Sequence, residues 1–186
     1  MSKVCCFTGH RPDKLYGYDI YSKEYIKLAT IIRNYIVKEL IPKGYDTFIT
    51  GGALGFDTVM FLVIKKLKKQ YSNIKNIVAV PFKNQPIKWS SSDKERYYNM
   101  LREADSVVYI DEIKIGEESK RFNVAAGVYC KEKMYDSNHY MVDISNFIIG
   151  AWNGSKSGTK ECLDYAKVKK IKGIYIDPKT LVIYDV

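Results

Sequence analysis

Short hydrophobic runs alternate with longer amphipathic stretches along the chain. The short runs are rich in Val, Ile, Phe and Tyr, a composition typical of strands. They predict strands at residues 4–7, 46–50, 76–80, 106–110, 146–151 and 172–176. In the first longer stretch, apolar residues recur every three or four positions from Tyr25 to Leu40, which predicts one apolar helix stripe that the PKG at 42–44 ends. Further helices are predicted at 55–70, 90–103, 119–135 and 158–170.

This order of elements predicts an α/β fold. Strands that alternate with helices are joined by right-handed crossovers, which place the strands in parallel and the helices on both faces. We therefore expect a Rossmann-like, doubly wound and mainly parallel sheet, in a single domain over residues 1–186. The LVIY run at 181–184 predicts an antiparallel hairpin with the last parallel strand.

The turns that leave the strands carry most of the glycine and special polar chemistry. In a doubly wound sheet these turns meet at one edge, where ligands bind at the point of strand-order reversal. They read TGHRP (8–12), TGGALGFD (50–57), PFKNQ (81–85) and WNGSKSGT (152–159). We therefore look for a binding site along this edge.

The turn at 50–57 places three glycines between a strand and a helix. Gly51, Gly52 and Gly55 can adopt positive φ and let a phosphate approach the N–H groups of the helix that follows. The pattern is neither the dinucleotide fingerprint, since Thr50 stands at its first glycine position, nor a Walker loop, since no GK[ST] follows. A tight turn without a ligand is the alternative interpretation.

The last glycine-rich turn has similar chemistry. Its hydroxyls and N–H groups predict phosphate or ribose binding, and Thr159 is a candidate cap of the final main helix. The candidate residues are Asn153, Gly154, Ser155, Ser157, Gly158 and Thr159. In the first turn, Arg11 beside Thr8 and Gly9 offers a fork of donors suited to phosphate, or equally a surface ion pair.

Composition narrows the partners. The 30 Lys and Arg outnumber the 21 Asp and Glu, so the net charge of +9 favours anionic partners. The densest basic cluster, KKLKK at 65–69, is better explained as the cationic end of a helix. The four cysteines show no zinc or disulfide spacing, and neither a signal peptide nor a run of about 20 apolar residues is found. We expect a cytoplasmic protein without a membrane span or a metal.

Five motifs in order resemble the YpsA-like branch of the SLOG superfamily, which groups Rossmann-like domains related to the DprA and LOG proteins. The motifs are TGHRP, GGALGFD, PF..Q...W from Pro81 through Gln85 to Trp89, NHYMVD at 138–143, and GSKSGTKECLDYA at 154–166. The resemblance spans about residues 3–176. It implies a nucleotide-derived ligand, such as NAD, ADP-ribose or a cyclic nucleotide signal, bound with no cofactor required. Some relatives sense nucleotide signals in bacterial and phage defence, and a homodimer fits both the family and the aromatic content.

The resemblance also assigns roles to residues. It places Gly9, His10 and Arg11 in the first-turn site, Gly51, Gly52 and Gly55 in a phosphate turn, and Asn138 and Asp143 in the binding set. Asp57 is expected to accept from a ribose hydroxyl or the base, and Trp89 to stack on a base or else to belong to the core. Ser137 stands where the family pattern usually has an arginine, and His139 is interpreted as a surface residue.

Three functions follow from the sequence. The first is a sensor or sequestering protein for a nucleotide-derived ligand. The second is N-glycosidic hydrolysis of the LOG type with Glu161 as the catalytic candidate, although the Pro-Gly-Gly lead of that motif is missing and Glu161 in a first helical turn also suits the helix dipole. The third is single-stranded nucleic-acid binding of the DprA type, which the net charge suggests and which would be steeply salt-dependent.

Overall fold

The computed structural model describes residues 2–113, 125 and 127–186. At its centre lies a seven-stranded sheet in the order β4-β3-β2-β1-β5-β6-β7. The strands are β1 (Lys3–Gly9), β2 (Tyr45–Thr50), β3 (Lys75–Val80), β4 (Ser106–Tyr109), β5 (Phe147–Ala151), β6 (Lys172–Ile176) and β7 (Ile183–Asp185). Every pairing is parallel except that of β6 with β7, which is antiparallel. The predicted α/β class and the terminal hairpin are both confirmed.

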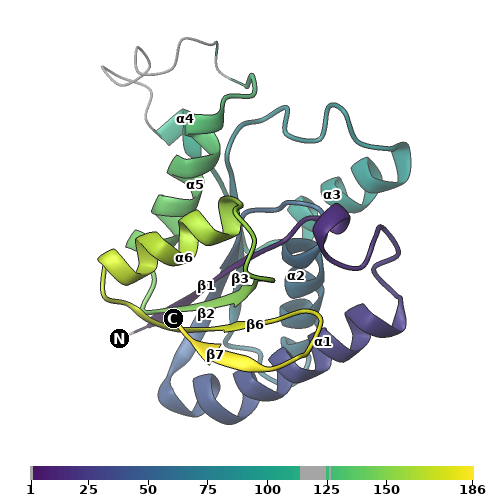
Figure 1. Cartoon of the computed structure of the whole chain (residues 1–186). Helices are drawn as coiled ribbons and strands as arrows, with labels where there is room; N and C mark the ends of the chain where they lie inside the picture. The colour runs from purple at the N-terminus through teal and green to yellow at the C-terminus, as the bar shows by residue number, and fades with distance from the viewer. Residues whose placement is uncertain (1, 114–124, 126) are drawn as a thin grey trace.

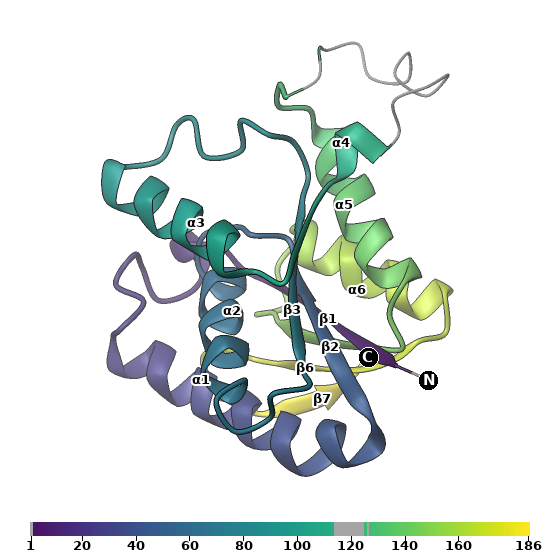
Figure 2. The same ribbon diagram turned by 180° about the vertical axis from the view of Figure 1, so that it is seen from behind.

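Helices cover both faces of this sheet (Figure 1, Figure 2). They are α1 (Lys23–Tyr35), α2 (Phe56–Leu67), α3 (Ser91–Glu103), α4 (Ile110–Ile113), α5 (Lys131–Asp143) and α6 (Gly158–Val168). A π-helical turn at Ile36–Leu40 and a 3₁₀ turn at Ile41–Lys43 follow α1, and Gly44 ends them with a φ of 85°. The apolar stripe expected from Tyr25 to Leu40 therefore continues through an irregular helical end.

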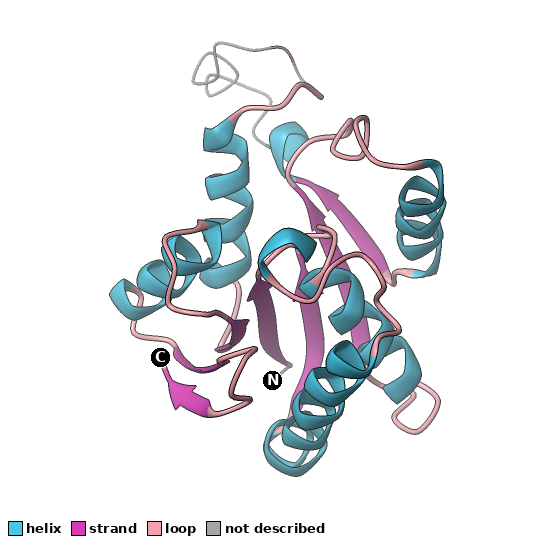
Figure 3. Ribbon diagram, turned by 45° about the vertical axis from the view of Figure 1, so that its right-hand side comes forward, coloured by secondary structure: helices cyan, strands magenta, loops and turns pink. Residues whose placement is uncertain are grey.

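The core is divided by the sheet into two layers. One cluster joins α1 and α2 to one face through residues such as Phe7, Phe48 and Phe56. A second joins α5 and α6 to the other face through residues such as Ile148 and Leu163. Figure 3 shows the helices on both sides of the strands. Strands β1 to β4 extend the sheet in one direction and β5 to β7 in the other, so the order reverses between β1 and β5.

The position predicted for the fourth helix, which corresponds to α5, is wrong. Residues 119–124 and 126 of the expected 119–135 helix lie outside the described residues, and 127–130 are not helical. Gly127 has a φ of 78°, and Cys130 is extended where it precedes α5. The helix therefore begins at Lys131, so the NHYMVD motif lies within it rather than after it.

Across the part of the chain that the structure describes, no helix has the length and apolar character needed to cross a bilayer.

Candidate functional site

A cleft of about 350 Å³ opens at the carboxyl end of β1, beside the reversal of strand order. Its walls come from the turn after β1, the turn before α2, α5 from Lys131 to Met141, and the start of α6. A volume of this size suits a small ligand. The candidate residues that line it are Thr8, Gly9, His10, Arg11, Gly51, Asp57, Pro81, Asn138, Ser157, Gly158 and Thr159.

The first turn is tied to the last glycine-rich turn through His10. Its Nε2 lies 2.7 Å from Asn153 Oδ1, which also accepts the backbone N–H of Ser155 at 3.1 Å. Burial lowers the pKa of His10 below its usual value, so the imidazole is neutral at pH 7. Asn153 thus supports the cleft without lining it. Its contact with His10 holds the first turn and the last glycine-rich turn next to each other.

The turn at 50–57 uses its glycines for contacts within the protein. Gly52 and Gly55 have φ angles of 69° and 87°, and neither lines the cleft. A Cβ on Gly55 would lie 2.9 Å from the His10 carbonyl oxygen, and one on Gly52 would lie 2.9 Å from Val78 Cγ1. These two glycines are therefore explained by close packing of neighbouring turns.

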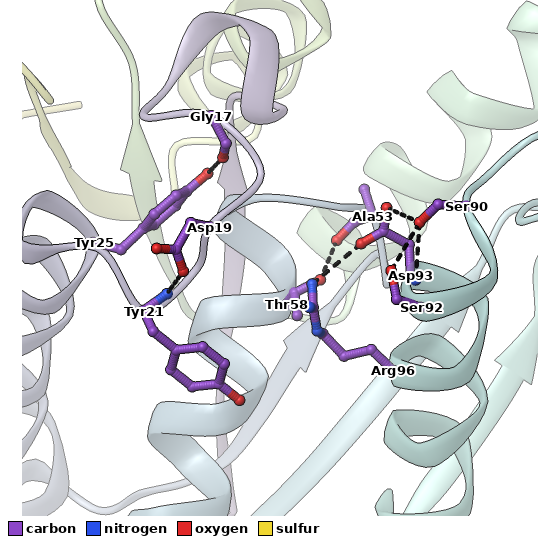
Figure 4. Close-up of polar contacts among 10 residues, drawn as sticks. All are labelled: Gly17, Asp19, Tyr21, Tyr25, Ala53, Thr58, Ser90, Ser92, Asp93 and Arg96. Carbon is purple, nitrogen blue, oxygen red and sulfur yellow. Dashed lines mark hydrogen bonds and ion pairs between the residues drawn. The ribbon is translucent and has the colours of Figure 1, made fainter.

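Asp57 closes the same turn from inside. Its Oδ2 accepts the backbone N–H of Ala53 at 3.2 Å. The next residue, Thr58, donates from its Oγ1 to the Ala53 carbonyl at 2.9 Å, a bond that Figure 4 shows. Burial raises the pKa of the Asp57 carboxyl group to about 7. The N–H groups of Ala53 and Gly51 and the positive charge of Arg11 lower the pKa, but they offset only part of the effect of burial. A carboxyl group therefore sits where the sequence predicted a phosphate.

The last glycine-rich turn is open by comparison. A Cβ on Gly154 or Gly158 would meet no atom within 4 Å. The cap of α6 is Ser157, whose Oγ accepts the backbone N–H of Lys160 at 3.3 Å, so the prediction of Thr159 as the cap is wrong. Thr159 is instead the second residue of α6 and lines the cleft. Because the first N–H groups of a helix lack partners inside it, this end of α6 offers donors to the cleft.

Positive charge in the cleft comes from three residues on different elements. Arg11 lies in the first turn, Lys14 ends the 3₁₀ turn Pro12–Lys14, and Lys131 begins α5. Among the described residues, the guanidinium of Arg11 makes no hydrogen bond or ion pair. The acidic lining residues are Asp13 and Asp57, so the three cations outnumber them and the cleft carries a net positive charge near pH 7.

Several of these lining residues were not found by sequence reasoning. Lys131, Met134 and Tyr135 lie in the first turns of α5, and Tyr129 precedes them. The prediction of a helix at 119–135 placed these residues at a carboxyl end, away from the binding edge. The extended Cys130 and the positive φ of Gly127 are the local features that reverse this placement.

Other candidates lie away from the cleft. Those that do not line it are Gly52, Gly55, Gln85, Trp89, Asp143, Asn153, Gly154 and Glu161. Trp89 packs edge-on against Tyr97, with ring centroids 5.3 Å apart, and Gln85 accepts from the Tyr97 hydroxyl at 3.4 Å. The alternative interpretation of Trp89 as part of the core therefore fits its position better than base stacking.

Glu161 is held between α5 and α6. Its Oε1 lies 2.5 Å from His139 Nε2, and its Oε2 accepts from Asn138 Nδ2 at 3.2 Å. The His139 ring stacks on Tyr165 at a centroid distance of 3.7 Å. Asp143, at the far end of α5, pairs with Lys169 at 2.7 Å and accepts from the Tyr165 hydroxyl. Glu161, the carboxylate considered for hydrolysis, and Asp143 are therefore both engaged in contacts between α5 and the α6 region.

No metal is suggested by the side chains in the described ranges, where no group of three or more His, Cys, Asp or Glu side chains could hold an ion. The four cysteines are free thiols. For the buried Cys6 and Cys162, burial raises the pKa, so both are neutral at pH 7.

Comparison with known proteins agrees with this architecture. The model of the YspA SLOG family matches residues 5–180. An uncharacterized SPbeta prophage-derived protein, YoqJ, of Bacillus subtilis is 40% identical over 141 residues, which is 76% of this chain and 78% of that protein. A UPF0398 protein of Bacillus pumilus is 30% identical over 56% of each chain, so this chain spans about half the length of that relative.

Solved structures show the same fold at low sequence identity. DNA processing protein A (DprA) from Streptococcus pneumoniae aligns with a TM-score of 0.58 at 13% identity, over 94% of this chain and 50% of that chain. DprA from Helicobacter pylori aligns with a TM-score of 0.54 at 13% identity, over 94% of this chain and 65% of that chain. With a family match across most of its length and this Rossmann-like architecture, the chain belongs to the YspA SLOG family of nucleotide-related binding domains.

Proposed function

We propose that the cleft binds a nucleotide-derived ligand of the NAD, ADP-ribose or cyclic-nucleotide type, and that the protein senses or sequesters it. The observation that carries this proposal is the meeting of Arg11, Lys14 and Lys131 with the start of α6 in one cleft. Three cations from three separate elements in one cleft favour an anionic ligand.

The phosphates are expected between the first turn and α6. Arg11 provides a fork of donors that matches phosphate oxygens, and Gly158 and Thr159 provide N–H groups at the positive end of a helix dipole. The open space around Gly158 lets a phosphate reach the backbone. This end of the cleft therefore supports phosphate binding better than the Asp57 turn does.

The base or the second sugar is expected toward α5. Tyr129, Met134 and Tyr135 line that side, and the Tyr135 ring lies 5.2 Å from the ammonium of Lys131. Tyr129 is 62% exposed, so its ring is available for stacking. Aromatic rings beside cations are a common setting for nucleotides, since bases stack on the rings while phosphates pair with the charges.

Binding without turnover is supported by the position of the acidic residues. Glu161 is bonded to His139 and Asn138 and does not line the cleft, and Asp143 lies at the other end of α5. General acid-base cleavage usually needs two placed groups at the reacting bond, and of Glu161, Asp143 and Asp57 only Asp57 lines the cleft. Hydrolysis therefore becomes an outcome to test, as does DNA binding, since the H. pylori DprA structure is described in terms of its single-stranded DNA binding mode.

The test is thermal stability followed by calorimetry with NAD, ADP-ribose, cyclic dinucleotides, AMP and a single-stranded oligonucleotide. A ligand that binds the folded state raises the melting midpoint with the logarithm of its excess over Kd. We expect R11A to weaken binding by about tenfold or more, because it removes a charge-assisted hydrogen bond of roughly 1.5–3 kcal/mol. The matched control is K27A, which removes an exposed cation of α1 outside the cleft.

Each outcome decides between the functions. A small ligand that binds with R11A-sensitive affinity and is recovered intact by chromatography supports sensing or sequestration. Recovery of cleaved ligand would replace the proposal with hydrolysis and make E161Q the first variant to assay. Binding of the oligonucleotide alone, with a steep fall in affinity as salt rises, would replace it with nucleic-acid binding.

A further inference from the structure

Asp57 is the one buried acidic residue in the described lining of the cleft. It belongs to the first turn of α2 and is 7% exposed. A Cβ at the neighbouring Gly51 would lie 3.0 Å from Asp57 Oδ2, so the carboxyl group is pressed against the backbone of the turn. Asp13, the other acidic lining residue, is exposed. The two carboxyl groups of the same cleft are thus in opposite environments.

Few groups around Asp57 change charge near neutral pH. Ala53 and Gly51 present backbone N–H groups, and Arg11 presents a permanent positive charge. Burial raises the pKa of Cys6 and Cys162, the thiols that face Asp57 from β1 and α6. Burial lowers the pKa of His10, and the cleft ammonium groups of Lys14 and Lys131 are exposed. Burial of its carboxyl group therefore brings the pKa of Asp57 to about 7.

We infer that the cleft takes up a proton on Asp57 when it binds the phosphates of its ligand. This inference rests on the proposed function and names the protonation state in which the site is competent. A phosphate bound at Arg11 uses the positive charge that now offsets the Asp57 carboxylate, and it adds a negative charge to the same cleft. Both changes disfavour the ionised carboxylate, whereas a neutral carboxyl group can stay buried beside the anion.

The direction of the pH dependence follows. The free protein holds Asp57 with a pKa of about 7, and the bound phosphate raises that pKa further. Below this pKa the proton is already present, so Kd is constant and no proton is taken up. Above it, each binding event must add a proton, so Kd rises by up to about tenfold per pH unit until the pH reaches the pKa of the complex.

The experiment uses ADP-ribose, whose pyrophosphate is a diester that stays ionised throughout this range. Calorimetry at pH 8 in HEPES and in Tris compares buffers that have different ionisation enthalpies and no phosphate to compete for the site, so the difference in observed enthalpy gives the number of protons taken up. We expect an uptake approaching one proton at pH 8, close to none at pH 6, and a Kd that increases about fivefold from pH 7 to pH 8, because Asp57 is already partly ionised at pH 7. NAD serves as a second probe with the same pyrophosphate.

The variants D57N and D13N form a matched pair from the same cleft. D57N keeps the shape and the acceptor for the Ala53 N–H, so we expect binding with no proton uptake and a flat Kd between pH 6 and pH 8. D13N should retain both the uptake and the slope. If D57N does not fold, the buffer pair measured on the unaltered protein still decides the question.

The failures are distinguishable. ADP-ribose or NAD that binds without proton uptake, with equal slopes for the unaltered protein and D57N, overturns this inference and leaves the proposed function standing. Absence of binding by every nucleotide probe at pH 6, where Asp57 is protonated, overturns the proposed function and this inference together.

Discussion

The two glycine-rich turns at the binding edge look alike in sequence and differ in structure. The turn at 50–57 is filled by the protein itself, since Asp57 takes the Ala53 N–H and a side chain on Gly55 would collide with the first turn. The turn at 152–159 is open, with no atom within 4 Å of the Cβ positions of Gly154 and Gly158. The glycine at position 55 is therefore needed because another part of the protein packs closely against it. Gly154 and Gly158 face open space instead.

This difference shifts the expected phosphate position from α2 to α6. Both helices begin beside the cleft, and both have a positive dipole end. Each helix has one carboxyl group in its first turn. At α2 it is Asp57, which lines the cleft and accepts the Ala53 N–H, whereas at α6 it is Glu161, which is bonded to His139 and does not line the cleft. The location of a carboxyl group, more than the number of glycines, separates a structural turn from a binding turn.

The largest expected effect is the contrast between two glycine-to-alanine variants, one in each turn. G55A places a Cβ 2.9 Å from the His10 carbonyl oxygen at a φ of 87°, so we expect a loss of about 4 kcal/mol in the free energy of unfolding. G158A meets open space and should change stability by less than about 0.5 kcal/mol. Urea unfolding of both variants measures the contrast, and equal losses would show that the turns are alike after all.

The next effect is the removal of the Asp57 charge. In the folded state its pKa is about 7, above the ordinary 3.8, so the neutral form is favoured by folding. The contribution of neutral Asp57 to the free energy of unfolding is therefore complete below pH 4 and is lost as the pH rises through 7. D57N should therefore be more stable than the unaltered protein by about 3 kcal/mol at pH 8 and by little at pH 4.

Melting curves from pH 4 to pH 8 measure this, with D13N as the control on an exposed carboxylate of the same cleft. A stability difference between D57N and the unaltered protein that does not grow with pH would mean that Asp57 is ionised at little cost. The turn at 50–57 would then contain an ordinary carboxylate that stays ionised when the protein folds.

The smallest effect sharpens the description of the open turn. Ser157 caps α6 through Lys160, so S157A should cost about 1 kcal/mol of stability. The Ser155 hydroxyl is buried and has no hydrogen-bond partner among the described residues, so S155A should be neutral or slightly stabilising. Thermal unfolding of the two alanine variants compares hydroxyls two positions apart; a larger loss for S155A would contradict the assignment of the cap.

The sequence predicted the fold better than it predicted the site. Strand runs are local and β-branched, so their positions followed from the hydrophobic pattern, and their parallel arrangement followed from their alternation with helices. Helix α5 was misplaced because no strong start signal marks it: Cys130 precedes it without a side-chain cap. Because of that error, the sequence did not identify Lys131 and Tyr135 as cleft residues. The position of α5 in the structure shows that they line the cleft.

Individual side chains were the hardest to place. Trp89 and Asp143 belong to motifs that the chain keeps, yet one packs on Tyr97 and the other pairs with Lys169. Glu161 lies in the first turn of α6, as expected, but it points toward α5 and is held by His139. Position along a motif fixes the element and not the direction in which a side chain points.

The sequence alone determined the alternation of strands and helices, the edge where the turns meet, and the polar chemistry that this edge carries. These properties depend on local periodicity and on the fixed hand of crossover connections, which need no knowledge of distant contacts. Only the tertiary structure decided that Asp57 is buried against the Ala53 N–H, that α5 supplies a cation and a tyrosine to the cleft, and that the α6 turn is the open one. Burial and charge balance arise from elements that meet in space, so no single stretch of the chain encodes them.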